Sequence, residues 1–167
     1  MQRFAAAPWP TSLKVLSGVG TILLLAVWVG AEQGVPARGA AHWVGTFMTW
    51  LPPALLVGAL LFTVRGYGIG AGELRVERLL WSTVIPLEGT PRAWHDPQAI
   101  RHSVKVFGNG GLYAFTGLYR SKSLGRYRLF GTDPARAVIV QLPGRTVVVT
   151  PELPHAFVQC LSQAAPR

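Results

Sequence analysis

The sequence predicts two transmembrane α-helices followed by a small antiparallel β-barrel or sandwich of about seven strands with a C-terminal α-helix. Three observations predict this fold class. Two long uncharged apolar stretches occupy the first part of the chain. The remainder alternates apolar and polar residues between turn dipeptides. Charged residues make up only 14% of the chain, against about 25% in typical soluble domains, which favours a membrane protein.

Residues 1–65 are expected to form a membrane anchor. Val15–Ala31 has 17 residues without a charge, and Trp43–Val64 has 22. At about 1.5 Å per residue these stretches extend ~26 Å and ~33 Å as helices, close to the ~30 Å of a bilayer core. We therefore expect helices at about residues 13–31 and 43–64, the second kinked at Pro52-Pro53.

Two alternatives to a pair of spans remain open from the sequence. The first stretch follows Arg3 and Lys14 and ends in small residues before Glu32, as a cleavable signal peptide would. The two stretches could also form a buried hairpin in a soluble domain, but the sequence around them offers little polar surface to cover it. An uncleaved hairpin in the membrane is the preferred interpretation.

Basic residues near the span ends predict the orientation. Arg3 and Lys14 flank the first span, and Arg65 follows the second directly. The connection EQGVPARGAAH holds one arginine and one glutamate. Since cytoplasmic loops carry the excess of Lys and Arg, both termini and the following domain are expected in the cytoplasm. The protein is thus expected as a multi-pass protein of the inner (plasma) membrane.

Residues 66–167 are expected to form a β domain. The clearest hairpin joins a strand at Leu112–Ser121 to another at Gly125–Thr132. Pro143-Gly144 is expected to connect two further strands, AVIVQL and RTVVVT. These strands and the shorter ones expected earlier in the domain predict a small barrel or an orthogonal sandwich.

The start of this domain predicts short strands around Ala71-Gly72 and Leu80-Trp81. The segment PRAWHDPQAIRHSVKVF stays open between a loop and a short helical turn, because it contains two prolines. At the end of the chain, Phe157, Cys160 and Leu161 lie at i, i+3 and i+4, which predicts a C-terminal helix.

Three segments of this half resemble the bacterial pleckstrin-homology-like (bacterial PH) domain family: YGIGAGELRVER, GNGGLYAFTGLYRSKSLGRYRLFGTDPARAVIV and VVVTPELPHAF. The resemblance covers about Arg65 to Gln163, and Gly108–Gly111 and RLFGTDP are its most specific parts. It implies a PH-like barrel behind one or two membrane spans and a non-enzymatic role, with no particular ligand. Leu153 departs from the acidic residue expected at the entry to the last helix.

The glycine-rich run Gly108–Gly111 raises the question of a phosphate-binding loop. Such a loop needs a helix N-terminus after it, whereas LYAFTGLY, which follows here, predicts a strand. We therefore expect a structural turn at Asn109, Gly110 and Gly111, in which both glycines supply positive φ.

Four cations lie within nine residues around the predicted hairpin: Arg120, Lys122, Arg126 and Arg128. The whole of residues 65–167 has thirteen Lys and Arg against six Asp and Glu. One interpretation is an ordinary solvated hairpin, and the other is a site for anionic lipid headgroups, with Tyr119 and Tyr127 at the headgroup level. Nucleic acid is not expected as a partner, because the membrane surface already within reach explains the charge.

Enzyme chemistry has little support in the sequence. The four histidines, His42, His95, His102 and His155, form no metal-binding spacing. The single Cys160 excludes an internal disulfide and a Cys-based metal cluster, and it is expected as a small buried residue. His95-Asp96 is expected as a surface turn. No metal site and no cofactor are predicted.

The sequence therefore predicts a non-enzymatic integral membrane protein with a cytoplasmic PH-like binding or scaffolding domain. Membrane lipids are the first expected partner, and a protein partner or a second copy is also considered. The alternative is an accessory subunit of a larger membrane complex that packs through its spans, which small residues such as Gly18 and Gly58 would permit.

Overall fold

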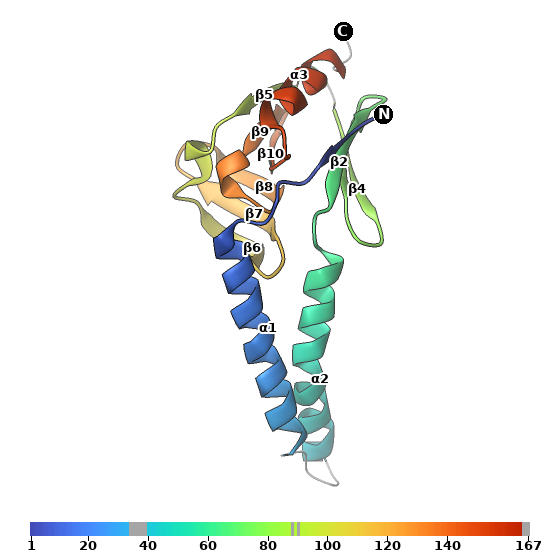
Figure 1. Cartoon of the computed structure of the whole chain (residues 1–167), viewed down its shortest axis with the longest axis vertical. Coiled ribbons are helices and arrows are strands. Elements are labelled where there is room, and N and C mark those ends of the chain that lie inside the picture. The colour runs from blue at the N-terminus through green and yellow to red at the C-terminus, as the bar shows by residue number, and fades with distance from the viewer. Residues whose placement is uncertain (34–39, 88, 90, 165–167) are drawn as a thin grey trace.

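A two-sheet sandwich stands on two long helices in the computed structural model (Figure 1). The structure describes residues 1–33, 40–87, 89 and 91–164. The helices lie below the sandwich, and the sandwich holds both the N-terminal strand and the C-terminal helix.

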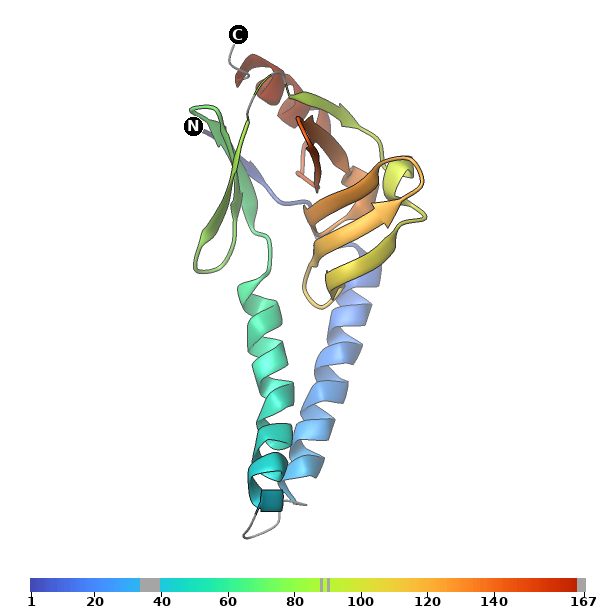
Figure 2. The ribbon, with the colours of Figure 1, turned by 180° about the vertical axis from the view of Figure 1, so that it is seen from behind.

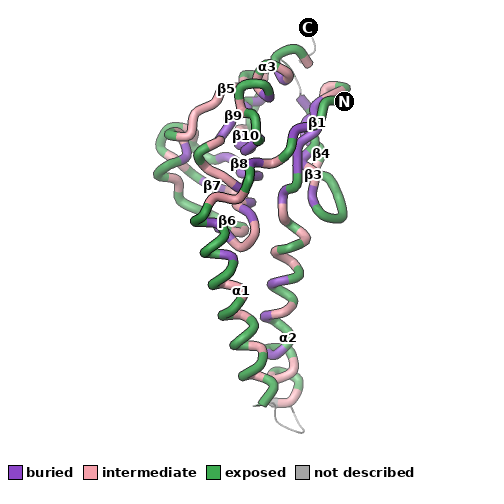
Figure 3. The backbone as a smooth tube through the Cα atoms, viewed as in Figure 1, coloured by how far each residue is buried: buried purple, intermediate pink, exposed green. Residues whose placement is uncertain are grey.

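The two helices confirm the predicted apolar hairpin. α1 spans Thr11–Glu32 and α2 spans Ala40–Leu61, with Pro52 and Pro53 inside α2. Both are long and apolar enough to cross a membrane. Most of their described surface is exposed (Figure 3), which suits a lipid environment better than water. Residues 34–39 of the connection, on which the predicted orientation partly depends, lie outside the described residues.

The smaller sheet has four antiparallel strands in the order β1-β2-β3-β4. Its strands are β1 (Gln2–Ala5), β2 (Gly66–Gly70), β3 (Glu73–Glu77) and β4 (Ser82–Pro86). The sequence analysis did not anticipate β1, which lies before the first helix yet pairs with β2 behind the second. Phe4 of β1 packs edge-on against Phe157 at 5.2 Å. The anchor and the β domain therefore share a core.

The larger sheet has six strands in the order β5-β9-β10-β8-β7-β6. They are β5 (Arg92–His95), β6 (Val104–Gly110), β7 (Phe115–Ser121), β8 (Gly125–Gly131), β9 (Val138–Leu142) and β10 (Arg145–Val149). The segment left open in the sequence contributes β5, the short 3-10 helix η1 (Gln98–Ile100) and part of β6.

The expected PH-like sandwich with a C-terminal helix is confirmed, with two differences. The described residues form ten strands in two sheets and no closed barrel. The β8–β10 pair is also parallel, because the chain passes through the 3-10 helix η2 (Pro134–Arg136) and β9 before it returns beside β8.

Two apolar cores hold the sandwich together. The first lies between the sheets and under α3 (Pro154–Ala164), where Tyr67, Leu74, Val149 and Phe157 are buried. The second lies on the other face of the six-stranded sheet, where Tyr127, Leu129 and Ile139 pack against Ile100 of η1. α3 thus covers one part of the sandwich as predicted, and Leu161 is fully buried on it.

The helices converge at their connected ends and separate toward the sandwich (Figures 1 and 2). Between the helices, Trp28 of α1 and Trp50 of α2 lie with ring centroids 6.1 Å apart. At the wide end, α2 leads into β2, whereas the segment before α1 crosses to the larger sheet, where the hydroxyl of Thr132 donates to the carbonyl of Ala7 at 2.6 Å. The two sheets therefore hold the upper helix ends apart.

Candidate functional site

A cleft of about 400 Å³ lies between the sheets. β4 forms one wall, and β8 and β10 form the other. Arg126, Arg128 and Phe130 share one face of β8 because strand residues alternate. Phe130 is buried in the first core, but Arg126 and Arg128 are exposed. The cleft thus begins where the packed core between the sheets ends.

Three arginines line this cleft. Arg126 and Arg128 extend from β8, and Arg145 extends from β10. Nη2 of Arg145 donates to the carbonyl of Pro86 across the cleft at 3.0 Å. None of the three forms an ion pair with a carboxylate of the described residues; the ion pairs found there are Arg3–Glu77, Arg75–Glu73 and Arg136–Asp133. An anion would meet several uncompensated guanidinium groups in the cleft.

A second cavity, of about 730 Å³, shares Leu118, Arg128 and Phe130 with the cleft. It lies in the wide part of the gap between the helices. Its lower wall is apolar and comes from one residue of α1, Leu24, and a run of α2: Ala54, Leu55, Gly58, Ala59 and Phe62. Its upper wall comes from β6, β7 and β8.

Arg78 marks the upper end of this second cavity. It is only 9% exposed, and its guanidinium lies between three rings, 5.1 Å from that of Phe62, 5.9 Å from that of Trp81 and 5.3 Å from that of Phe130. Burial lowers the pKa of the Arg78 guanidinium, although an arginine stays protonated in proteins.

Hydrogen bonds give Arg78 a structural role as well. Its Nη1 donates to the carbonyl of Phe62 at 2.8 Å, just beyond the end of α2, and its Nε donates to Thr83 at 3.3 Å. A cation at a helix C-terminus is favoured by the helix dipole. The described residues offer it no ion pair, so the contacts seen for its charge are one carbonyl, one hydroxyl and three aromatic faces. The sequence signal for this residue was an arginine directly before the apolar turn Leu79-Leu80-Trp81.

The structure places three of the four predicted cations on one face of the β7–β8 hairpin and the fourth in its turn. Arg120 pairs with Arg126 across the β7–β8 hairpin, so it shares the face of Arg126 and Arg128. Lys122 lies in the exposed turn beyond this face. One strand of the hairpin, β8, therefore contributes Arg126 and Arg128 to a wall of the cleft.

The predicted headgroup position of Tyr119 and Tyr127 is wrong. Both side chains are buried in the second core, 7% and 2% exposed, and their rings stack at 5.9 Å. Tyr119 of β7 and Tyr127 of β8 pair directly, so they occupy the opposite face of the β7–β8 hairpin from the arginines. Neither tyrosine ring therefore lies beside the hairpin cations on their own face of the sheet.

The structure shifts the turn predicted at Asn109, Gly110 and Gly111. Asn109 and Gly110 still pair with β7 as the end of β6, and the β6–β7 turn begins at Gly111 and lies against α1. Oδ1 of Asn109 accepts hydrogen bonds from the backbone N–H groups of Gly111 and Leu112. Gly111 has φ +126°, as predicted, but Gly110 has no positive φ; the second position is Gly108, at +118°. A phosphate-binding geometry is absent from this described segment, because a strand follows it.

Residues of α1 that the sequence analysis missed hold this turn in place. Oγ of Ser17 donates to the carbonyl of Gly111 at 3.2 Å and accepts from the N–H of Tyr113 at 2.9 Å. The hydroxyls of Thr21 and Tyr113 share a hydrogen bond of 2.7 Å, and Trp9 stacks on Tyr113 at 6.1 Å. In the sequence, Ser17 and Thr21 are two hydroxyl residues four positions apart in an apolar segment, and this spacing could have indicated a contact on one helix face. The sandwich is thus fixed to the upper part of α1.

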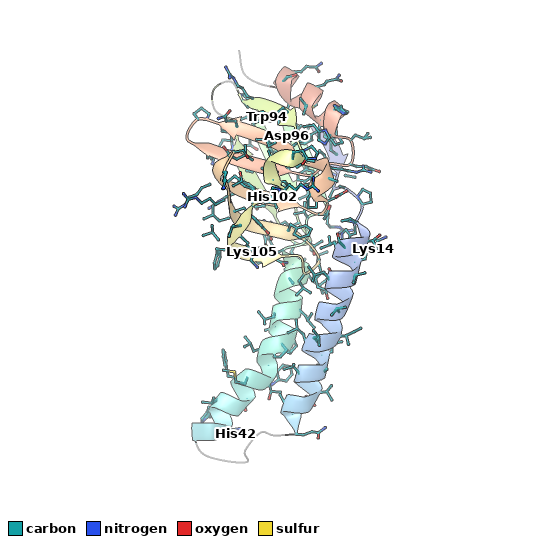
Figure 4. All side chains as sticks on the ribbon, turned by 90° about the vertical axis from the view of Figure 1, so that its left-hand side faces the viewer. Lys14, His42, Trp94, Asp96, His102 and Lys105 are labelled. Carbon is teal, nitrogen blue, oxygen red and sulfur yellow. The ribbon has the colours of Figure 1, made fainter. Side chains whose placement is uncertain are left out.

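Exposed apolar side chains occur in the β3–β4 turn and on the edge strand β6. Leu79, Leu80 and Trp81 form the exposed β3–β4 turn beside the end of α2, where Trp81 contacts Phe62 at 5.1 Å. Val104, Val106 and Phe107 are exposed on β6, the edge strand next to α1. Figure 4 shows Lys105 of β6 and Lys14 of α1 where the sandwich meets the helices, while His42 lies at the far end of α2.

The histidine, aspartate and cysteine candidates have contacts that indicate a structural role. Among the described residues, no group of three or more His, Cys, Asp and Glu could hold a metal ion. Asp96 accepts hydrogen bonds from the N–H groups of Gln98 and Ala99, so it caps η1 as a surface turn. Cys160 is half-buried on α3 against the first core, and burial raises its pKa.

Comparison with protein families gives one result for the β domain. A model described as the bacterial PH domain matches residues 65–165, which is more than half of the chain. Searches of curated proteins and of solved structures gave no match. The matched range contains β2 to β10 and α3, including the three arginines of the cleft. The chain belongs to the bacterial PH domain family.

Proposed function

We propose that this protein is a non-enzymatic, membrane-anchored PH-like module that holds the anionic headgroup of a membrane lipid in the cleft between its sheets. The observation that carries the proposal is the position of Arg126, Arg128 and Arg145. These guanidinium groups line one cleft without a carboxylate partner among the described residues, and the cleft continues into the gap between the helices.

The membrane anchor supports a lipid as the source of the anion. Both helices are long and apolar enough to span a bilayer, and the sandwich is fixed to α1 through Ser17 and Thr21. The module is then always beside the membrane surface, so the effective concentration of headgroups is high. Each cation near an anionic surface contributes ~1 kcal/mol, and three of them make a weak but oriented contact.

Orientation and location extend the proposal. Basic residues before the first span and after the second favour both termini and the sandwich on the cytoplasmic side of the inner membrane. That side carries the anionic leaflet that the arginines require. Leu80 and Trp81 of the β3–β4 turn and Phe107 of β6 then lie at the interface, where aromatic and apolar side chains are favoured.

The direct test compares two soluble phospholipids that differ in charge. Purified full-length protein in a neutral detergent should gain thermal stability from dioctanoyl phosphatidylglycerol and gain little from dioctanoyl phosphatidylcholine. The double variant Arg126→Gln/Arg128→Gln should weaken the phosphatidylglycerol effect by about tenfold or more, because hydrogen bonds to charged groups are the strong ones.

The matched control is Arg92→Gln/Arg101→Gln, which removes the same charge from exposed positions outside the cleft. It should bind phosphatidylglycerol as the parent does. If both double variants lose the same affinity, general charge and not the cleft is responsible, and the proposed function fails.

A partner within the membrane is the second candidate. The helices expose apolar surface along most of their length, and a Cβ at Gly18 or Gly30 would meet nothing within 4 Å. Close approach of another helix is therefore sterically open at these positions. Such a partner would remain with the protein in stoichiometric amount after extraction in mild detergent.

A further inference from the structure

The second cavity lies where the two helices separate below the sandwich. Its lower wall is built from small and apolar residues of α2 and from Leu24 of α1. Ala54 and Gly58 lie four residues apart and therefore on one face of α2, and a Cβ at Gly58 would meet nothing within 4 Å. The small side chains thus leave the space open. Its volume of about 730 Å³ lies within the ~300–1,000 Å³ typical of ligand pockets.

The cavity is amphipathic along the direction of the helices. Its lower part has no charged group, whereas Arg78 and Arg128 line its upper part. Leu55 and Phe62 are seven residues apart on the chain, which corresponds to about 10 Å along a helix. An occupant that satisfies both parts has an anionic group at one end and an apolar chain at the other.

The surroundings of the cavity point to a lipid as this occupant. Its apolar part lies between two helices that are long enough to span a bilayer, so acyl chains surround it on the open sides. Phe107, 80% exposed, lies at its rim on the edge strand β6. Arg128 belongs to both the cavity and the cleft above, so one headgroup can reach the cleft while its chain stays below.

We infer that the cleft and the second cavity form one site for a single anionic phospholipid, with its phosphate at Arg78 and Arg128 and an acyl chain between α1 and α2. This inference rests on the proposed headgroup function and adds the chain to it. The site therefore binds one lipid molecule, whereas a basic surface would contact the headgroups of many lipids at once. Arg145 and Arg126 then contact the outer part of the headgroup.

The experiment separates the chain from the headgroup with two probes. Dioleoyl phosphatidylglycerol carries both parts, and glycerophosphoglycerol carries the same headgroup without chains. Binding of each to the full-length protein in detergent is measured by native mass spectrometry. The parent should bind the phospholipid at least about a hundredfold more tightly, because each buried methylene adds to affinity.

Filling the cavity should remove only the chain contribution. Gly58→Leu places a side chain in the open space, and displacement of about two methylenes predicts about a tenfold loss of phospholipid affinity. Its affinity for glycerophosphoglycerol should not change. Ala54→Leu, one turn away on the same wall, should act in the same direction. The matched control is Gly18→Leu on α1, where a Cβ also meets nothing within 4 Å and which does not line the cavity.

The outcomes distinguish this inference from the proposed function. If Gly58→Leu and Ala54→Leu bind phospholipid like Gly18→Leu while Arg126→Gln/Arg128→Gln loses it, the chain site fails and headgroup binding stands. Equal parent affinity for the two probes also overturns the chain site. If the arginine variant binds both probes as the parent does, both proposals fail.

Discussion

Oγ of Ser17 accepts a hydrogen bond from the backbone N–H of Tyr113 at 2.9 Å, across 96 residues of sequence. The same oxygen donates to the carbonyl of Gly111. Ser17 is 3% exposed and lies about 4.5 Å along the helix from Lys14. One hydroxyl inside the first apolar helix thus satisfies two backbone groups of the β6–β7 turn, which an apolar environment would otherwise leave unpaired.

Ser17→Ala should loosen the sandwich from α1. It leaves a buried donor and a buried acceptor without partners, so the expected loss of stability is about 1–3 kcal/mol. Hydrogen exchange of residues 108–118 in detergent should accelerate, while exchange of β9 should stay slow. Thr49→Ala is the control, since its hydroxyl donates to the carbonyl of Gly45 within its own helix. Equal exchange in both variants would contradict the docking role.

The two glycines predicted for this turn should differ in their tolerance of alanine. Gly111 has φ +126°, and a Cβ there would clash with Leu16 of α1. At Gly110 the atoms nearest to an added Cβ belong to the flexible side chain of Lys105, the first of them at 2.8 Å. We expect Gly111→Ala to destabilise the protein by roughly 1 kcal/mol or more and Gly110→Ala by much less. Urea or thermal unfolding of both variants measures the difference, and equal losses would refute the assignment.

Phe4 should be essential to the sandwich although it precedes the two long apolar helices. It is buried against Phe157 in the first core, so Phe4→Ala should cost about 3–5 kcal/mol. Phe47→Ala, at an exposed position on α2, is the control and should have little effect. A fragment of residues 66–167 lacks β1 and should unfold at a lower temperature than the full chain. A fragment as stable as the full chain would show that β1 adds nothing.

Tyr67 predicts an alkaline loss of stability. Its hydroxyl donates to the carbonyl of Phe130 at 2.7 Å and accepts from the N–H of Thr150, and burial raises its pKa to about 12. In the unfolded chain the tyrosine pKa is near 10, so the unfolded state loses this proton at a lower pH than the folded state. The Tyr67 contribution is therefore complete below about pH 10 and is lost as pH rises through about 12, at ~1.4 kcal/mol per unit.

The measurement compares the parent with Tyr67→Phe at pH 9.5 and pH 11.5. The variant should be less stable at the lower pH, because the N–H of Thr150 loses its acceptor. It should then lose roughly 2 kcal/mol less than the parent on going to the higher pH. Tyr119, whose pKa burial also raises to about 12, keeps its own alkaline effect in both proteins. Identical pH dependence would contradict the assignment.

Membrane topology can be tested by cysteine labelling in a Cys160→Ser background. A cysteine at Gly39, in the connection between the helices, should react with a membrane-impermeant reagent in whole cells. One at Lys122, in the exposed β7–β8 turn, should react only after the membrane is opened. The reverse pattern would place the sandwich outside the cytoplasm and remove the support from the anionic inner leaflet.

The sequence alone determined those features that depend on local pattern. The apolar runs predicted the helices now seen at Thr11–Glu32 and Ala40–Leu61, because helix length and hydropathy are properties of one segment. Alternation predicted the β7–β8 hairpin within a few residues, with Arg126 and Arg128 in its second strand. The motifs of the second half also led to the family.

Only the tertiary structure decided what surrounds those residues. Gln2–Ala5 is too short to be recognised as a strand alone, and it became one because β2 offers an edge and Phe157 a packing partner. Tyr127 lies in the second core and Arg128 lines the cleft, because the two faces of the sheet are covered by different parts of the chain. Alternation shows that the two residues lie on opposite faces, but it cannot show which face is buried. Arg78 meets Phe62, Trp81 and Phe130 only once α2, the β3–β4 turn and β8 come together, since contacts between distant segments depend on packing and leave no mark in local periodicity.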